Sequence, residues 1–387
     1  MLDSWRGLCA LLVAAFHLSA SSHFFGTPFM HGTWLFVDFF FVLSGFVITH
    51  AYGDRLATGV DIANFAIRRF GRLWPLHVAV LLMFVALEVS KALVVAYTGA
   101  SFQRVPFTGN FGAYNFLDGL FFLQTTPLAP GVAPNEPSWS IAAEWWVYLI
   151  FALLTIATIG IARWQRALVV ATALVAALAT VYFGASDLHF GTTEMLALPR
   201  CLYGFLTGHI AYRIWRRRQQ ALRGVGQYEL AAVALLFLFI CVAQDFHLVL
   251  LSQPIFALII ILFAQEEGAV SRVLLTRPMA RLGELSYSIY MIHWLMIEFF
   301  IRAFTIAQKV SGRVLVVPID PSYNHTLGER DMFTIGGLYG GDLVLITFLV
   351  LTVAVATLTH RYVELPGQRF FNRLAYRFAR RSVPAEA

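Results

Sequence analysis

Long apolar stretches recur along the whole chain, and each is close to the length that crosses a lipid bilayer, about 20 residues. We place ten of them, near residues 8–24, 34–52, 73–98, 139–161, 167–184, 194–215, 228–246, 248–265, 284–304 and 341–361. Only helices and closed barrels can span a membrane, and continuous apolar stretches of this length indicate helices. The pattern therefore predicts an all-α integral membrane protein, a bundle of about ten transmembrane helices.

The polar segments between these stretches are short. The two longest cover residues 99–138 and 305–340. Within the first, residues 115–124 are too few to cross the bilayer and predict a re-entrant or interfacial helix. No segment is long enough to bury a core of its own, so we expect residues 1–387 to form a single membrane domain with no fused soluble domain.

Composition agrees with a membrane protein. Hydrophobic residues make up 59% of the chain and charged residues 13%, whereas a soluble domain carries about 25% charged residues. With the N-terminus in the cytoplasm, the predicted spans place 21 of the 28 Lys and Arg residues on the cytoplasmic side and five outside. The positive-inside rule therefore predicts that both termini are cytoplasmic.

The net charge of +6 follows from this asymmetry. No basic stripe is interleaved with stacking aromatic residues, so we expect no nucleic-acid partner. The three cysteines, Cys9, Cys201 and Cys241, lie within predicted spans at unrelated spacings. They indicate neither a disulfide framework nor a metal site.

Arg6 and His17 lie in the first apolar stretch, eleven residues apart. Eleven residues make three helical turns plus about 20°, so both side chains share one face, roughly 16 Å apart along the axis. The guanidinium can hold an anion near the membrane surface, and the imidazole can move a proton deeper in the bilayer. The alternatives are an interhelical hydrogen bond for His17 and a topology signal for Arg6. We favour a catalytic role for His17.

Arg68, Arg69 and Arg72 precede the third span, and the last two are neighbours on a helix surface. Paired guanidinium groups make forked contacts with phosphate oxygens, which makes the three arginines candidate cofactor-binding residues. A plain positive-inside cluster is the alternative.

Glu144 shares a stripe with Ser140 and Tyr148 inside the membrane, where a carboxylate needs a partner. It is a candidate catalytic residue, and a structural ion pair is its alternative.

Three further polar residues in predicted spans are candidate substrate-binding residues: Asp38, Arg200 and His293. For Asp38 we favour a structural cap or pair. Arg200 repeats at intervals of four with Gly204 and Gly208, which predict a helix-packing seam. His293 shares a face with Ser286 and Tyr290, so an interhelical hydrogen bond is its alternative.

Taken in order, these stretches make the chain resemble the acyltransferase-3 family of integral membrane proteins over nearly its whole length. The resemblance is carried by Leu2-Asp3-x-x-Arg6-Gly7 with His17, the run from Asp38 to Phe46, Arg69-x-x-Arg72 before Pro75, Ser138-Trp139-Ser140 to Glu144-Trp145, and Ser286 to His293. It implies a multi-pass protein of the bacterial inner membrane. It also implies transfer of an acyl group, usually acetyl, from cytoplasmic acyl-coenzyme A to a carbohydrate hydroxyl outside.

The family's functional positions, carried over, are Arg6, His17, Arg69, Arg72 and Glu144. We expect the coenzyme to bind Arg68, Arg69 and Arg72, His17 to act as the base, and Glu144 to orient the imidazole. Arg6 would hold the coenzyme or stabilise an oxyanion. No metal is expected; the partners are a carbohydrate acceptor and membrane lipids.

Several alternatives remain open at this point. Buried Arg, Glu and His residues also mark the pathway of a transporter for a glycan or a lipid-linked intermediate. A succinyl donor would suit Arg200. The acceptor, the oligomeric state and the choice between direct transfer and a covalent intermediate on His17 are also open.

Overall fold

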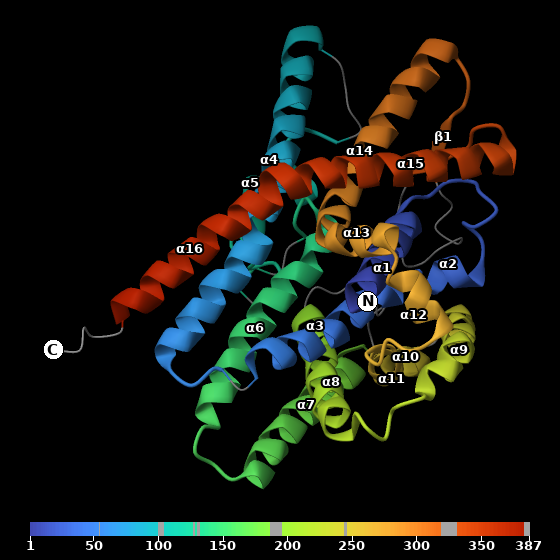
Figure 1. The fold of residues 1–387 in the computed structure, drawn as a ribbon. Coiled ribbons are helices and arrows are strands. Elements are labelled where there is room, and N and C mark those ends of the chain that lie inside the picture. The colour runs from blue at the N-terminus through green and yellow to red at the C-terminus, as the bar shows by residue number, and fades with distance from the viewer. Residues whose placement is uncertain are drawn as a thin grey trace. The chain divides into compact units, whose positions relative to one another are not determined.

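Where the structure describes it, the chain folds mainly into α-helices (Figure 1). The computed structural model describes residues 1–53, 55–99, 104–126, 128–129, 132–185, 196–243, 246–318 and 331–382. The α-helices are α1 (Leu2–His17), α2 (Pro28–Gly32), α3 (Phe36–Tyr52), α4 (Gly59–Thr98), α5 (Ala113–Leu120), α6 (Trp139–Ala157), α7 (Arg163–Ala185), α8 (Ala197–Arg218), α9 (Glu229–Val242), α10 (Phe246–Leu250), α11 (Ser252–Phe263), α12 (Ala269–Leu274), α13 (Arg277–Glu284), α14 (Ser286–Ser311), α15 (Gly337–Thr359) and α16 (Leu365–Ser382).

Helices lie at all ten stretches that the hydrophobic pattern selected. Among the described residues, seven are long and apolar enough to cross a membrane: Pro28–Tyr52, Gly59–Thr98, Glu136–Ala157, Arg163–Phe183, Val225–Val242, Ser286–Ser311 and Gly337–Ala379. Helix α1 has 16 residues and α11 has 12, so both fall short in length. The protein is therefore an all-α membrane protein, whereas ten crossings and the side of the termini stay predictions.

By its internal contacts the chain divides into two compact units. The first comprises Met1–His50, Tyr182–Thr192 and Tyr203–Thr357, and the second comprises Ala51–Val181, Thr193–Leu202 and Leu358–Ala387. Each unit draws on three separate stretches of chain, so neither is a contiguous segment. The expectation of a single membrane domain stays a prediction.

In the first unit, α1 is held by close backbone packing on α13. A Cβ on Gly7 would lie 2.6 Å from the Leu282 carbonyl carbon, and a Cβ on Gly283 would lie 2.4 Å from the Asp3 carbonyl oxygen. The buried Ser4 hydroxyl donates to the Leu274 carbonyl at 2.7 Å. These contacts explain the glycine that follows Arg6, because any side chain there would separate the two helices.

The first predicted span, 8–24, is wrong in its C-terminal part because α1 ends at His17. The backbone of Ser19 and Ser21 pairs instead with Phe333, at 2.9 Å in both directions. Phe333 belongs to β2 (Asp331–Phe333), which pairs antiparallel with β1 (Val316–Pro318). A buried apolar cluster surrounds this end of α1, with members on α1, α2, α14, β2 and α15.

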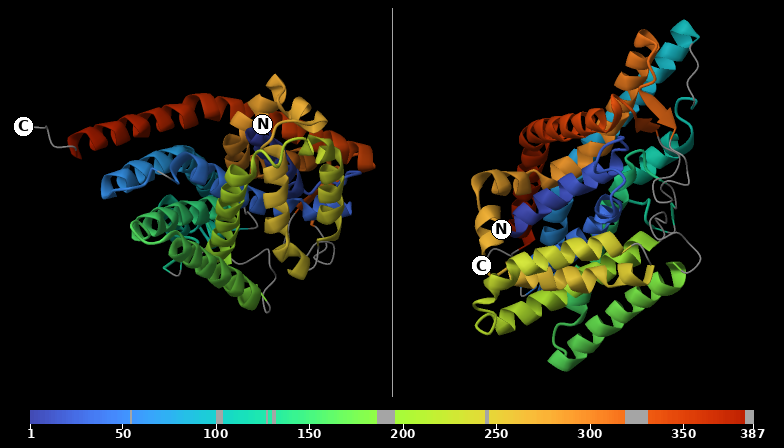
Figure 2. Two further views of the ribbon diagram at one scale, coloured as in Figure 1. Left: turned by 60° about the horizontal axis from the view of Figure 1, so that its bottom comes forward. Right: turned by 90° about the vertical axis from the view of Figure 1, so that its right-hand side faces the viewer.

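Helices α3 and α8 cross at the seam that the glycine spacing predicted. A Cβ on Gly208 would lie 1.9 Å from the Val42 carbonyl oxygen, and one on Gly45 would lie 1.9 Å from the Phe205 carbonyl oxygen. The two backbones therefore approach as closely as glycine permits. In the same unit, α9 and α11 lie side by side (Figure 2).

In the second unit, α4 begins with a capping box formed by Thr58 and Asp61. The short helix α5 lies where the sequence predicted a re-entrant or interfacial helix, near residues 115–124, and its position relative to the membrane stays a prediction. Three ring N–H groups contact carbonyls at its C-terminal end: Trp74 on Leu120 at 3.1 Å, His77 on Gly119 at 2.8 Å and Trp146 on Phe122 at 2.8 Å. These ring N–H groups fix the end of α5 against α4 and α6, and the Gly119 carbonyl also accepts from the Phe122 backbone N–H.

Candidate active site

His17 and His293 lie in direct contact, although 276 residues separate them in the chain. Nε2 of His293 lies 3.1 Å from Nδ1 of His17, and the ring centroids are 5.0 Å apart. His17 is the last residue of α1, and His293 lies in the second turn of α14. The structure therefore joins two residues that the sequence placed in separate roles, one catalytic and one substrate-binding.

Backbone carbonyls determine which nitrogen of each ring carries the proton. Nδ1 of His17 lies 2.9 Å from the Val13 carbonyl oxygen, and Nδ1 of His293 lies 2.5 Å from the Tyr290 carbonyl oxygen. A carbonyl only accepts hydrogen bonds, so each Nδ1 is protonated in the neutral ring. Nε2 of His293 then presents a lone pair to the same N–H of His17, which the Val13 carbonyl and His293 share. The remaining lone pair of His17 lies on its Nε2, the nitrogen that a general base uses.

The surroundings of the pair differ between the two rings. His293 is fully buried, at 0% exposed, whereas His17 is only half-buried. The Trp294 ring stands edge-on to His17 at 5.5 Å, and Tyr290 lies beside His293 at 5.5 Å. His17 is therefore the more accessible of the two rings, and its role in proton exchange stays a prediction.

Arg6 lies on the same helix as His17, as its spacing predicted. Its guanidinium is 3.5 Å from the Asp3 carboxylate, at the edge of ion-pair range, and its side chain is 33% exposed. A partly exposed pair of this length holds the guanidinium only weakly. Arg6 thus lies near the start of α1, three turns from the imidazole.

The three arginines of α4 have separate partners rather than one shared site. Nε of Arg68 donates to the Asn64 amide oxygen at 2.7 Å. Nη2 of Arg69 lies 3.3 Å from the Tyr52 hydroxyl, and its guanidinium lies 5.3 Å from that ring's centroid. Arg72 forms an ion pair with the buried Glu364. The sequence found the cluster but missed Glu364 as the partner of Arg72.

One of these guanidinium groups has an unsatisfied donor. Nε of Arg69 is buried and has no hydrogen-bond partner among the residues that the structure describes. A buried donor of a charged group costs free energy until an acceptor reaches it. Arg69 therefore has the property expected of an anion-binding residue.

Glu144 accepts a hydrogen bond from the Tyr148 hydroxyl at 2.5 Å, one turn further along α6. This contact confirms that the two residues share a stripe. Tyr148 contacts the Phe65 ring, which contacts Tyr52, the partner of Arg69. Glu144 and Arg69 are therefore linked through three aromatic rings inside the second unit. Whether Glu144 orients His17, which belongs to the first unit, stays a prediction.

Asp38 and Arg200 lie in helix packing. Asp38 is 1% exposed and accepts from the Gln253 amide at 3.2 Å, which supports the structural alternative. Arg200 is 4% exposed and lies 5.5 Å from the Trp139 ring centroid, at the start of the helix that carries Glu144. Neither contact identifies a substrate. Their substrate-binding roles stay predictions.

Comparison with known proteins identifies the family. Residues 2–361 match the model of the family described as "Acyltransferase domain". This is the acyltransferase-3 family that the sequence motifs resemble. The chain belongs to this acyltransferase family. As an acyltransferase with several helices able to span a membrane, it is a multi-pass membrane enzyme.

Curated relatives of this acyltransferase include three bacterial proteins. "Protein 2 in picA locus" of Rhizobium radiobacter is 33% identical over 187 residues, 47% of this chain and 90% of that protein. "Acyltransferase MdmB" of Streptomyces mycarofaciens is 26% identical over 319 residues, 77% and 79% of the two chains. "O-acetyltransferase OatA" of Staphylococcus aureus (strain NCTC 8325 / PS 47) is 23% identical over 342 residues, 82% of this chain. The match covers only 53% of that last protein. No solved structure matches the chain at a significant level.

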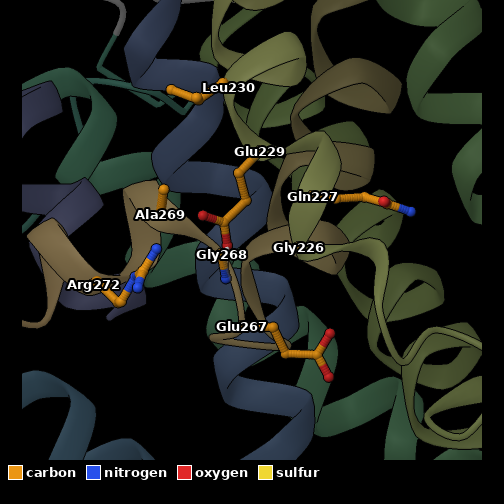
Figure 3. A pocket seen from close by; sticks show the side chains of 8 residues that line it. All are labelled: Gly226, Gln227, Glu229, Leu230, Glu267, Gly268, Ala269 and Arg272. Carbon is orange, nitrogen blue, oxygen red and sulfur yellow. Dashed lines mark hydrogen bonds between the residues drawn. The ribbon is translucent and has the colours of Figure 1, made fainter.

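The acyltransferase also has a pocket of about 290 Å³ between the starts of α9 and α12 (Figure 3). The buried Glu229 points toward Gly268 and accepts backbone N–H bonds from Gly268 at 3.0 Å and Ser271 at 2.8 Å. Glu229 thereby caps α12. None of the candidate site residues lines this pocket. Within the described chain, no group of three or more His, Cys, Asp or Glu residues could hold a metal ion.

Proposed function

We propose that the protein is an O-acyltransferase that moves an acyl group, most simply acetyl, from acyl-coenzyme A to a carbohydrate hydroxyl. The donor would enter from the cytoplasm and the acceptor from the outer side of a bacterial inner membrane. This arrangement uses ten crossings with both termini inside, which the distribution of basic residues supports. The name O-acetyltransferase, printed for the Staphylococcus relative, supports acetyl transfer to oxygen.

The contact between His17 and His293 is the observation that carries the proposal. A sugar hydroxyl is a weak nucleophile near neutral pH and needs a base. Nε2 of His17 takes the hydroxyl proton while the oxygen attacks the thioester carbonyl carbon. The carbon–sulfur bond then breaks, and the coenzyme sulfur leaves with the proton that the imidazolium returns. The products are an O-acyl ester and the free thiol of coenzyme A.

His293 supports this step through Nδ1 of His17. As His17 becomes positive, its N–H bond to the His293 lone pair turns into a charge-assisted hydrogen bond. A nucleophile, a base and an orienting group form the usual set for acyl transfer. Here the orienting group is a second imidazole. Glu144, predicted for that role, is left to balance charge or to bind acceptor hydroxyls together with Tyr148.

The donor would be held by its phosphates at the start of α4. Arg69 supplies a buried donor without a partner among the described residues, which a phosphate oxygen would satisfy. Arg68 and Arg72 add positive charge on the same helix. Arg6 would contact the coenzyme or the oxyanion. Membership of an acyltransferase family argues against a transporter that makes no bonds.

The test uses membranes that contain the protein, labelled acetyl-coenzyme A and a fraction of envelope glycans. Wild-type protein should transfer the label to the glycan, and His17→Ala should lower the rate about 10²- to 10⁴-fold, the usual contribution of a general base. His50→Ala is the matched control. This histidine lies on α3 in the same unit and bonds the Tyr212 hydroxyl at 3.2 Å, outside the site. Full transfer by the His17→Ala protein would refute the proposal.

A further inference from the structure

Helix α16 continues α15 without a break in the chain, through a π-helical turn at His360–Glu364 (Figure 1). Helix α15 has 23 residues and is about 35 Å long, which already covers a hydrocarbon core of about 30 Å. The 18 residues of α16 must therefore lie in another environment. They include five arginines and no acidic residue.

One face of α16 packs on the start of α4 within the second unit. A Cβ on Gly367 would lie 2.5 Å from the Cβ of Pro75. A Cβ on Gly71 would lie 2.1 Å from the Cβ of Phe371. Ala375, one turn further along, is 0% exposed. This face fixes α16 against the segment of α4 that carries Arg69 and Arg72.

A second face is apolar and exposed. Phe370, Leu374 and Phe378 follow one another at intervals of four and are 63%, 44% and 40% exposed. At about 100° per residue they form one stripe along the helix. Three large apolar side chains in a row, each at least 40% exposed, indicate a surface that contacts something else.

A third face is basic. Arg369, Arg373 and Arg377 also follow at intervals of four, about 100° around the helix from the apolar stripe, and all three are exposed. An apolar stripe beside a basic stripe is the pattern of a helix that lies in the plane of a membrane surface. The apolar side chains enter the boundary of the acyl chains, and the arginines meet negative headgroups.

We propose that α16 is a lipid-binding helix that lies on the inner leaflet and recognises anionic phospholipid. The all-positive charge of the helix and its direct continuation from a membrane-length helix favour a lipid surface over a protein partner. The proposal has a consequence that rests on the proposed function. Because Glu364, which directly precedes α16, is the ion-pair partner of Arg72, lipid binding would hold the coenzyme-binding arginines in place.

The test uses the full-length protein in nanodiscs of phosphatidylcholine alone or mixed with an equal amount of phosphatidylglycerol. Chymotrypsin cleaves after Phe, Tyr and Leu, so the rate of cleavage within the apolar stripe measures how accessible that stripe is. The fragments are followed by mass spectrometry. A basic residue near an anionic surface contributes about a fivefold effect. We therefore expect cleavage within 370–378 to be at least about tenfold slower in the anionic discs, with the difference reduced in high salt.

Variants identify the cause. Arg369→Gln, Arg373→Gln and Arg377→Gln together should abolish the difference between the lipids, whereas the three Arg→Lys changes should keep it. The matched control neutralises three arginines at the end of α8: Arg216, Arg217 and Arg218. It should behave like the wild type. Equal cleavage in both lipids, or protection only in native membranes that contain other proteins, would overturn the proposal. Cleavage does not require coenzyme binding, so the result stands even if the His17 experiment fails.

Discussion

Replacing His293 distinguishes a positioning role from the substrate-binding role that the sequence predicted. In His293→Ala one of the two acceptors near the His17 Nδ1 proton, the His293 nitrogen 3.1 Å away, is absent, and the Val13 carbonyl at 2.9 Å remains. A neutral hydrogen bond contributes about 0.5–1.5 kcal/mol and one to a charged group about 1.5–3 kcal/mol. His17 is neutral in the ground state and positive in the transition state. The rate therefore depends only on the difference between these two hydrogen-bond energies, about 1–1.5 kcal/mol. Because the Val13 carbonyl still accepts from this N–H, about 5- to 13-fold is the largest fall in kcat that we expect.

The assay is the initial rate of label transfer from acetyl-coenzyme A, measured over a range of both substrates and of pH. We expect kcat to fall and the KM of each substrate to stay unchanged. The acid limb of the pH–rate profile should move, because that limb reports the proton on His17. His293→Gln keeps an acceptor near the position of Nε2 and should recover part of the rate. Thermal unfolding of both variants shows whether the protein remains folded.

Two results would refute this reasoning. A rise in the acceptor's KM with unchanged kcat would show that His293 binds substrate, as the sequence predicted. A folded His293→Ala protein with wild-type kcat and an unmoved acid limb would show that the contact with His17 is only structural. Either outcome would leave the orienting role unassigned, with Glu144 as the remaining prediction.

Three further changes test other parts of the structure. Arg69→Ala should raise the KM for the coenzyme about 10-fold or more and leave kcat unchanged. Arg69→Lys should recover only part of the affinity, because a lysine lacks the planar fork of a guanidinium group. An unaffected KM would remove Arg69 from the donor site. Gly208→Ala places a Cβ against a carbonyl oxygen and should lower the free energy of unfolding by about 1–3 kcal/mol. Gly59→Ala is the control and should cost nothing, because no atom lies within 4 Å of its Cβ. Equal melting temperatures of the two variants would contradict the close α3–α8 packing. Glu364→Ala leaves Arg72 without its ion-pair partner and should cost about 3 kcal/mol, and a melting temperature equal to that of the wild type would argue against this pairing.

Local properties of the sequence were sufficient for much of the secondary structure. Helices follow from continuous apolar composition, and the shared face of Arg6 and His17 follows from a period of 3.6 residues. The glycine seam of α8 was also predicted correctly, because small residues at intervals of four leave only close helix packing as an explanation. In each case the signal lies within one continuous stretch of chain.

The end of α1 was predicted wrongly because the deciding contact is distant. Residues 18–20 are apolar or small and resemble a continued span. Their backbone pairs instead with Phe333, more than 300 residues later. A hydrogen-bonded partner so far along the chain leaves no trace in the local pattern. Helix α1 consequently ends at His17 and places its C-terminal carbonyl groups at the imidazole.

The candidate site divides in the same way. The residue types, and therefore the chemistry, were visible in the sequence: an imidazole in a span, arginines before another span, and a carboxylate in a third. Only the tertiary structure paired His17 with His293 and Arg72 with Glu364, across 276 and 292 residues. Composition and periodicity determine which segments are helices and which face is polar, because these depend on neighbouring residues. Which polar groups meet depends on how separate helices pack, and that is decided by contacts between residues far apart in the chain.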